Sequence, residues 1–284
     1  MRRTGRGWGI PGALTTLVAL VVLVALVEGC TSQPAQPTAP GHPTSETPSQ
    51  QSQQPPQFPW ARYQERDNTR LWRVDSGVSR LTVLVYKTGP LQRLGHNHVV
   101  ESRDLMGYAL QATPLSDSYA DLYLPLAGLI VDDPSARAAA GPAFESIPTP
   151  QAIHATRANM LGARLLNAEV YPWVHMHVGV PDLKPDLSLS AKEPQMQPAR
   201  SSGVTQARVE IELAGHRSIQ PVPVSWWWSP DEVRLESRFT LTHGQLGLTP
   251  FSAVGGALRV QQELQFHLEL SLKPASLPVT LPGA

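Results

Sequence analysis

Hydrophobic and polar residues alternate along the last part of the chain. From Leu258 to Leu272 every second residue is apolar, with Gln262 the only polar member, and the positions between carry polar or charged side chains. A period of two places alternate side chains on opposite faces of a β-strand. The stretch is longer than an ordinary strand of about five or six residues, and long two-faced strands are typical of closed antiparallel barrels. We therefore expect a barrel strand whose apolar face lines an interior.

The same period recurs in shorter stretches upstream, and no β-α-β rhythm separates them. The expected strands are 71–75, 80–88, 106–112, 119–126, 173–180, 204–213, 219–228 and 233–242. Between 132 and 168 the period changes, and Thr149 followed by Pro150 marks the start of one short helix. The polar, proline-containing stretch 182–203 is expected to be a long loop. The pattern predicts an all-β fold, an antiparallel barrel of eight or so strands with a short helical insertion.

The N-terminal residues have the features of an export signal. Three arginines in the first nine residues precede an uncharged, mostly apolar segment, 10–27. Val27-Glu28-Gly29-Cys30 resembles the lipobox of bacterial lipoproteins, in which the cysteine is acylated; Glu28 departs from that pattern. We expect 1–29 to be a signal peptide and Cys30 to be lipidated, with an uncleaved membrane anchor as the alternative. In either case the remainder is exported and membrane-anchored, facing the periplasm or the cell exterior.

Composition divides the rest of the chain. Residues 30–59 are rich in Pro, Gln, Ser and Thr without apolar periodicity, which predicts a disordered tether. Residues 60–275 are expected to form the barrel domain and 276–284 a C-terminal tail. The 23 basic residues balance the 23 acidic ones, so nucleic acid is not an expected partner. A single cysteine excludes internal disulfides and cysteine-rich zinc sites. The sequence leaves a homodimer open.

The apolar positions of the alternating strands are the candidate ligand-binding residues. They are almost all aliphatic, which suits a hydrocarbon tail better than a polar ligand. The set comprises Leu81, Val83, Val85, Leu122, Leu124, Val174, Met176, Val178, Val209, Ile211, Phe239, Leu264, Phe266 and Leu268. No cofactor is expected beyond a bound isoprenoid or fatty-acid-like lipid.

Two histidine pairs are the most conspicuous polar motifs. His96 and His98 are two residues apart, and His175 and His177 repeat the spacing, which on a strand places both imidazoles on one face. A metal or haem site would need the pairs to meet, because two imidazoles fall short of the four ligands of a structural zinc site. The favoured interpretation is that His96 and His98 are polar residues that form hydrogen bonds at the barrel mouth.

The remaining motifs give little evidence for an aromatic binding site or for catalysis. In Trp226-Trp227-Trp228 the alternation turns Trp227 away from its two neighbours, so barrel packing is preferred over a single aromatic patch. The chain lacks Gly-x-Ser-x-Gly, a glycine-rich phosphate loop and His-Glu-x-x-His. No catalytic residue is therefore assigned; an enzyme that uses Asp132, Asp133 or a histidine as a base on a bound lipid ranks last.

Several stretches, in order, resemble the YceI-like family of exported bacterial proteins. The matching segments are 74–76 with 79–83, 95–99, 156–161, 168–172, 215–222 and 245–251. The resemblance spans about Leu71 to Leu272 and departs in insertions near 132–150 and 182–203. It implies a lipocalin-like barrel that binds polyisoprenoid or related lipids.

These observations lead to two hypotheses about function, one a lipid carrier and the other a metal- or haem-binding protein. The leading hypothesis is an extracytoplasmic carrier that holds an isoprenoid or another long apolar lipid inside the barrel. The runner-up is a periplasmic metal- or haem-binding protein that uses His96, His98, His175 and His177.

Overall fold

The structure is a computed structural model that describes residues 57–63, 68–183 and 201–277. The expected signal peptide, the lipidated Cys30, most of the tether, most of the 182–203 loop and most of the C-terminal tail lie outside the described residues. Within the described part, no helix is long and apolar enough to cross a membrane.

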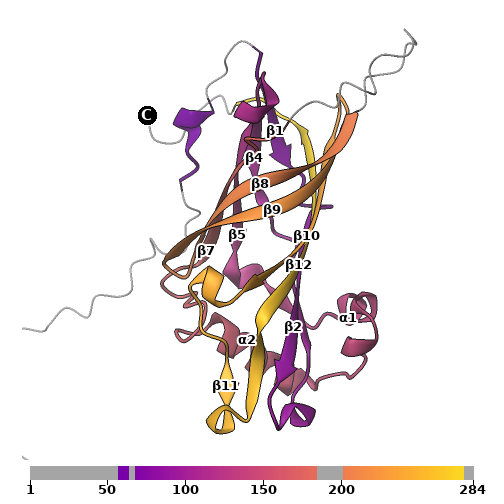
Figure 1. The fold of residues 1–284 in the computed structure, drawn as a ribbon, viewed down its shortest axis with the longest axis vertical. Coiled ribbons are helices and arrows are strands. Elements are labelled where there is room, and N and C mark those ends of the chain that lie inside the picture. The colour runs from indigo at the N-terminus through magenta and orange to yellow at the C-terminus, as the bar shows by residue number, and fades with distance from the viewer. Residues whose placement is uncertain (1–56, 64–67, 184–200, 278–284) are drawn as a thin grey trace, which may run out of the picture. The chain divides into compact units, whose positions relative to one another are not determined.

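Eight strands close into an antiparallel barrel (Figure 1). Their order around the wall is β1-β4-β5-β7-β8-β9-β10-β12, and β12 pairs again with β1. The expected all-β barrel is therefore confirmed. The wall strands are β1 (Arg70–Val74), β4 (Met106–Gln111), β5 (Tyr119–Pro125), β7 (Trp173–Gly179), β8 (Ser201–Leu213), β9 (His216–Trp228), β10 (Val233–Thr242) and β12 (Leu258–Pro274).

The register keeps apolar residues on the inner face. β8 and β9 pair along their whole length, from Ser201 opposite Trp228 to Leu213 opposite His216. β10 pairs with β12 from Val233 to Thr242, and there Phe239 stacks on Phe266 with ring centroids 5.0 Å apart. β9 and β10 pair only from Val233 to Glu236. Cross-strand pairs of this kind are the stabilising unit of a sheet.

A second group of strands continues the sheet beyond the closed wall. β2 (Arg80–Thr88) pairs with the first part of β12, β3 (His98–Ser102) pairs with β2, and β6 (Ile130–Val131) pairs with β3. Short β11 (Ser252–Ala253) pairs with the start of β12. β1 and β2 thus lie end to end along one edge of the long β12.

The alternation in β12 is interrupted where the sequence suggested none. Val260 lies opposite Lys87 and Leu264 opposite Val85, so four steps on β12 match two on β2. An irregularity of this type bends a strand without changing which residues face inward. Gln262 lies in this interruption and is exposed, and its carbonyl accepts a hydrogen bond from the backbone of His243.

Two helices, not one, occupy the insertion. α2 (Pro150–Leu161) starts as expected, with the Thr149 hydroxyl accepting a hydrogen bond from the amide of Ala152 at 3.2 Å. α1 (Pro134–Ala140) was not expected, and Asp133 caps its N-terminus. Its alanine-rich sequence carries no apolar stripe, so periodicity alone could not reveal it. α1 lies against β3 and α2 against β6 (Figure 1).

The inner residues form two packed groups. One is centred on Trp72, Leu122, Leu124 and Leu272, and the other on Val209, Ile211 and Leu264. Val83, Val85, Val174, Met176 and Val178 are partly buried and pack against both groups. The side chains that connect the two groups are therefore less buried than the groups themselves.

Candidate functional site

The barrel interior contains the residues expected to contact a ligand. All fourteen belong to one or both of the two inner groups, so the strand alternation placed them on the correct face. Whether they bind a ligand stays a prediction.

Most of these inner side chains are not fully buried. Leu122, Leu124, Val209, Ile211 and Leu264 are buried, whereas the other nine of the fourteen are half-buried. The half-buried ones are Leu81, Val83, Val85, Val174, Met176, Val178, Phe239, Phe266 and Leu268. A side chain that faces inward in a packed core has almost no accessible surface. The interior is therefore tightly packed in two places and looser between them.

His98 and Asp132 form the polar site nearest to the first histidine pair. His98 starts β3 and shares the inner face with Val100, since its register partner is Val85. Its Nδ1 lies 2.7 Å from Asp132 Oδ2, and Arg137 donates to Asp132 Oδ1 at 2.5 Å. Burial alone would raise the pKa of Asp132, but these two partners and the Val99 amide hold it below its ordinary value.

His96 precedes β3 and lies beside His98. Its ring centroid is 6.4 Å from that of His98. Partial burial lowers the pKa of His96, and the neighbouring His98 and Lys87 lower it further. Hydrogen bonding was the favoured role for this pair, and the structure provides it for His98 through Asp132.

The second histidine pair lies on the outer face, around Asp121. His175 Nε2 and His177 Nδ1 both donate to Asp121 Oδ1, at 3.0 and 2.9 Å, and the Tyr63 hydroxyl donates to Oδ2 at 2.9 Å. Burial alone would raise the pKa of Asp121, whose side chain is fully covered, but the three donors hold it below its ordinary value. The pKa of Tyr123, whose ring stacks on His175, is raised to about 12 by burial and by the charge of Asp121.

These contacts weigh against a shared metal centre. In the first pair His98 is bonded to Asp132, and both members of the second pair are bonded to Asp121, so the two pairs are engaged by different carboxylates. Among the described residues, no three or more histidine, cysteine, aspartate or glutamate side chains are arranged to hold a metal ion. The two carboxylates suggested as bases are also engaged, because Asp132 is ion-paired and Asp133 caps α1.

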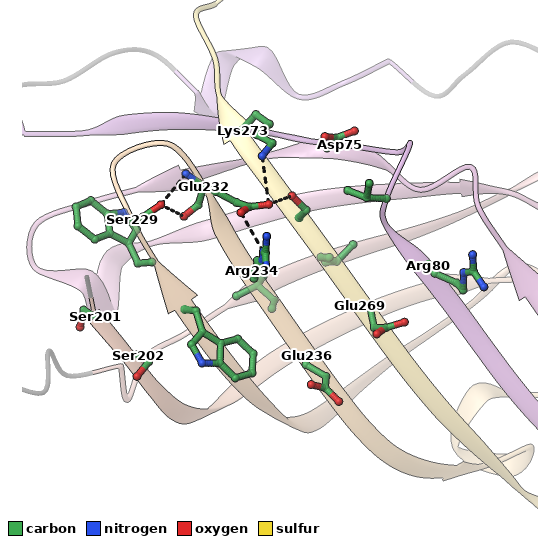
Figure 2. Close-up of a pocket in the computed structure, with 16 residues that line it drawn as sticks. Asp75, Arg80, Ser201, Ser202, Ser229, Glu232, Arg234, Glu236, Glu269 and Lys273 are labelled. Carbon is green, nitrogen blue, oxygen red and sulfur yellow. Dashed lines mark hydrogen bonds and ion pairs between the residues drawn. The ribbon is translucent and has the colours of Figure 1, made fainter. Parts of the chain in front are cut away.

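A large groove on the barrel surface has a different character. It has a volume of about 1210 Å³ and is lined by charged residues from β10 and β12, among them Arg234, Glu236, Glu269 and Lys273. At its centre Glu232 accepts hydrogen bonds from Ser271 and Arg234 and forms an ion pair with Lys273 (Figure 2). The charged groups favour water and polar ligands. Trp228 and Leu235, which pack against an inner group, also line the groove, so it reaches the barrel end at the β9–β10 hairpin.

Sequence reasoning missed several residues of these sites. Asp121 was not singled out, although three side chains converge on it. Arg137 was not singled out, yet it is 5% exposed and donates to Asp132 and to the carbonyls of Asn97, Phe144 and Ser146. The donors to Asp121 lie 54 to 58 residues away in the sequence, whereas Asp132, Phe144 and Ser146 lie within nine residues of Arg137. No motif in the sequence marks either set of contacts.

Comparison with known proteins identifies similar solved structures. No family model matches the chain, and no curated protein matches it. One similar structure is a polyisoprenoid-binding domain from Saccharophagus degradans implicated in plant cell wall breakdown, with a TM-score of 0.47, 12% identity, and coverage of 72% of this chain and 98% of that one. Another is BcnA of Burkholderia cenocepacia, with a TM-score of 0.44, 9% identity, and coverage of 70% and 98%. What this chain binds must be inferred from its own residues.

Proposed function

We propose that the protein is a binding protein for a long apolar lipid, an isoprenoid or a fatty-acid-like molecule, held in the barrel interior. The observation that carries the proposal is the half-buried apolar surface between the two packed groups of the interior. An eight-stranded barrel has room for its own side chains or for one small ligand. Aliphatic walls with accessible surface favour a hydrocarbon as that ligand.

The energetics permit tight binding without a strong polar contact. A tail of about 20 methylenes buried at ~0.8 kcal/mol each would gain about 16 kcal/mol. Association costs roughly 4–15 kcal/mol in lost freedom. The surplus depends on how much of the tail fits, so the depth of the interior would select chain length.

The same proposal includes a carrier role at the membrane. The leader and Cys30 would export the chain and attach it to lipid, and residues 30–59 would let the barrel move away from the surface. A barrel that encloses its ligand can move a hydrocarbon through water without exposing it. Binding and transport need no catalytic residue, so we propose that the protein is not an enzyme.

The test is organic extraction of the full chain, purified from an exporting bacterial host, followed by mass spectrometry. We expect about one equivalent of a prenyl lipid or fatty acid. The Val178→Trp variant should lose it, because Val178 is half-buried on the inner face of β7. The matched control is Val204→Trp, at an outward position on β8 that is 75% exposed, and it should retain the lipid.

Two results would contradict the proposal. One is a wild-type protein that carries no lipid and takes up none of the added prenyl alcohols or fatty acids. The other is equal lipid content in the two tryptophan variants, provided that both show wild-type circular dichroism.

A further inference from the structure

Three buried polar atoms of the barrel wall have no hydrogen-bond partner, although Trp228, which carries one of them, is itself half-buried. Among the described residues, Thr205 Oγ1, Trp226 Nε1 and Trp228 Nε1 are buried and unpaired. Thr205 is 9% exposed and Trp226 8%. Buried polar atoms are nearly always hydrogen-bonded, because leaving one unpaired is unfavourable. Arg103 and Arg137 also have an unpaired Nε, but their guanidinium groups form other bonds.

The three side chains share the inner face at one end of the barrel. In the β8–β9 register, Gly203 lies opposite Trp226 and Ser201 opposite Trp228, and Thr205 follows Gly203 on the same face. This is the face of Ala207 and Val222, which belong to an inner packed group. Trp228 packs against the other inner group. Trp227, between the two inner tryptophans, is 46% exposed on the outside.

A glycine on β8 lets one of these indoles lie directly against the strand. A Cβ at Gly203 would lie 3.1 Å from Trp226 Nε1 and 3.0 Å from its Cζ2. The indole therefore lies against the bare backbone of β8, and any larger residue would collide with its nitrogen edge. Thr205 is diagonal to Trp226 in this register, a relation that brings side chains on one face within reach of each other.

The surroundings determine the kind of group that fits. An indole N–H only donates, whereas a threonine hydroxyl both donates and accepts. The charged residues of β8 and β9, Arg208, Glu210, Glu212 and Arg217, occupy outward positions of the register. The cations that other elements bring to this end are already engaged: Arg70 donates to the carbonyl of Pro230, and Arg234 and Lys273 pair with Glu232. A buried anion here would compete for them, and an unpaired buried charge is far less favourable than a neutral group.

We propose that Thr205, Trp226 and Trp228 bind the uncharged oxygen head, a hydroxyl or carbonyl, of a ligand whose apolar tail lies in the barrel. This inference rests on the proposed function and adds the chemistry and the place of the head. A hydroxyl oxygen has two lone pairs, so it can accept from both indole N–H groups while it donates to Thr205, and a carbonyl oxygen can accept from both indoles. The head would lie at the β9–β10 hairpin end, and the tail would extend towards Val178 and Phe266.

The test compares three 20-carbon prenyl probes: geranylgeraniol, the corresponding hydrocarbon without the hydroxyl, and geranylgeranyl diphosphate. Binding to the delipidated full chain is measured by equilibrium dialysis of tritiated probes. Trp226→Phe and Trp228→Phe remove the N–H and keep an aromatic ring, and Thr205→Val removes the hydroxyl at similar volume. Each should weaken binding of the alcohol by about fivefold, the value of one neutral hydrogen bond, and change binding of the hydrocarbon by less than about twofold. Comparing the alcohol with the hydrocarbon, on the wild type and on each variant, isolates the contact between the head of the ligand and the substituted side chain.

Trp227→Phe is the matched control and should leave both probes unaffected, because this tryptophan faces outward. The proposal is overturned if the inner variants weaken alcohol and hydrocarbon equally, as a packing or water-holding role predicts. It is also overturned if the diphosphate binds more than about tenfold tighter than the alcohol. Failure of all three probes to bind wild-type protein would instead overturn the proposed function. Unchanged melting temperatures of the variants show that a weaker affinity does not reflect unfolding.

Discussion

Two leucine-to-alanine variants test whether the barrel interior is packed throughout or partly open. Leu124 is 2% exposed in the first inner group, whereas Leu268, opposite Leu81 on β2, is half-buried. Leu124→Ala creates an enclosed cavity, so its cost should be about 3–5 kcal/mol. Leu268→Ala removes a side chain that water already reaches in part, and its cost should be about 1–1.5 kcal/mol.

The assay is urea unfolding of the lipid-free full chain, followed by far-ultraviolet circular dichroism. A shift of the midpoint at constant slope gives the change in the free energy of unfolding. Adding a bound lipid at about 100 times its dissociation constant should raise that free energy of the wild type by about 2.7 kcal/mol. Leu268→Ala should lose part of this gain, and Leu124→Ala should keep it. Equal costs near 3 kcal/mol for both variants would refute an open interior, because they would mean that Leu268 is as tightly packed as Leu124.

Three further predictions concern the anchor and the buried charges. Cys30→Ser should abolish incorporation of labelled palmitate and release the protein from the membrane fraction; label that persists in this variant would rule out acylation at Cys30. The low pKa of Asp121 stabilises the fold above the ordinary aspartate value of about 3.9, and this stability is lost as the pH falls through the lowered pKa. Asp121→Asn should therefore be less stable at pH 7 and show a flatter loss of unfolding free energy between about pH 4 and 2; an unchanged slope would contradict the role of the carboxylate. Arg137→Met leaves Asp132 buried without its partner and should cost about 3–5 kcal/mol in urea unfolding, part of which Asp132→Asn in the same chain should restore. If that double variant is no more stable than Arg137→Met, the loss comes from the carbonyl contacts of Arg137 and not from the ion pair.

The sequence predicted the bounds of two strands without error. β2 and β10 have the bounds expected from their apolar positions, because each has apolar residues towards the interior. β3 was missed because Val99, Val100, Glu101 and Ser102 are all buried, and a strand covered on both faces does not alternate. The interruption of β12 was missed because two additional residues preserve the period of two.

The candidate sites were predictable only in part. Alternation is a local property, so it could place Thr205, Trp226 and Trp228 on the inner face but could not show that they lack partners. The environment of Asp121 is made by Tyr63, 58 residues away, and by His175, 54 residues away. Contacts at that separation are set by the closure of the wall, which no stretch of sequence encodes alone.

The pairing of the first strand with the last has a consequence for how the chain matures. β1 contacts β12 through Trp72 opposite Pro274 and Val74 opposite Leu272, so closure requires residues about 200 positions apart. Most other neighbours in the wall are consecutive hairpins that can form as the chain emerges. Long-range pairing is slow because the loop entropy is lost before the contacts form. Until β12 arrives, the apolar inner face stays open to solvent and to other chains. C-terminal truncation before Leu258 should therefore yield an aggregating chain instead of a smaller barrel, and the final strand determines when the protein can first enclose a lipid.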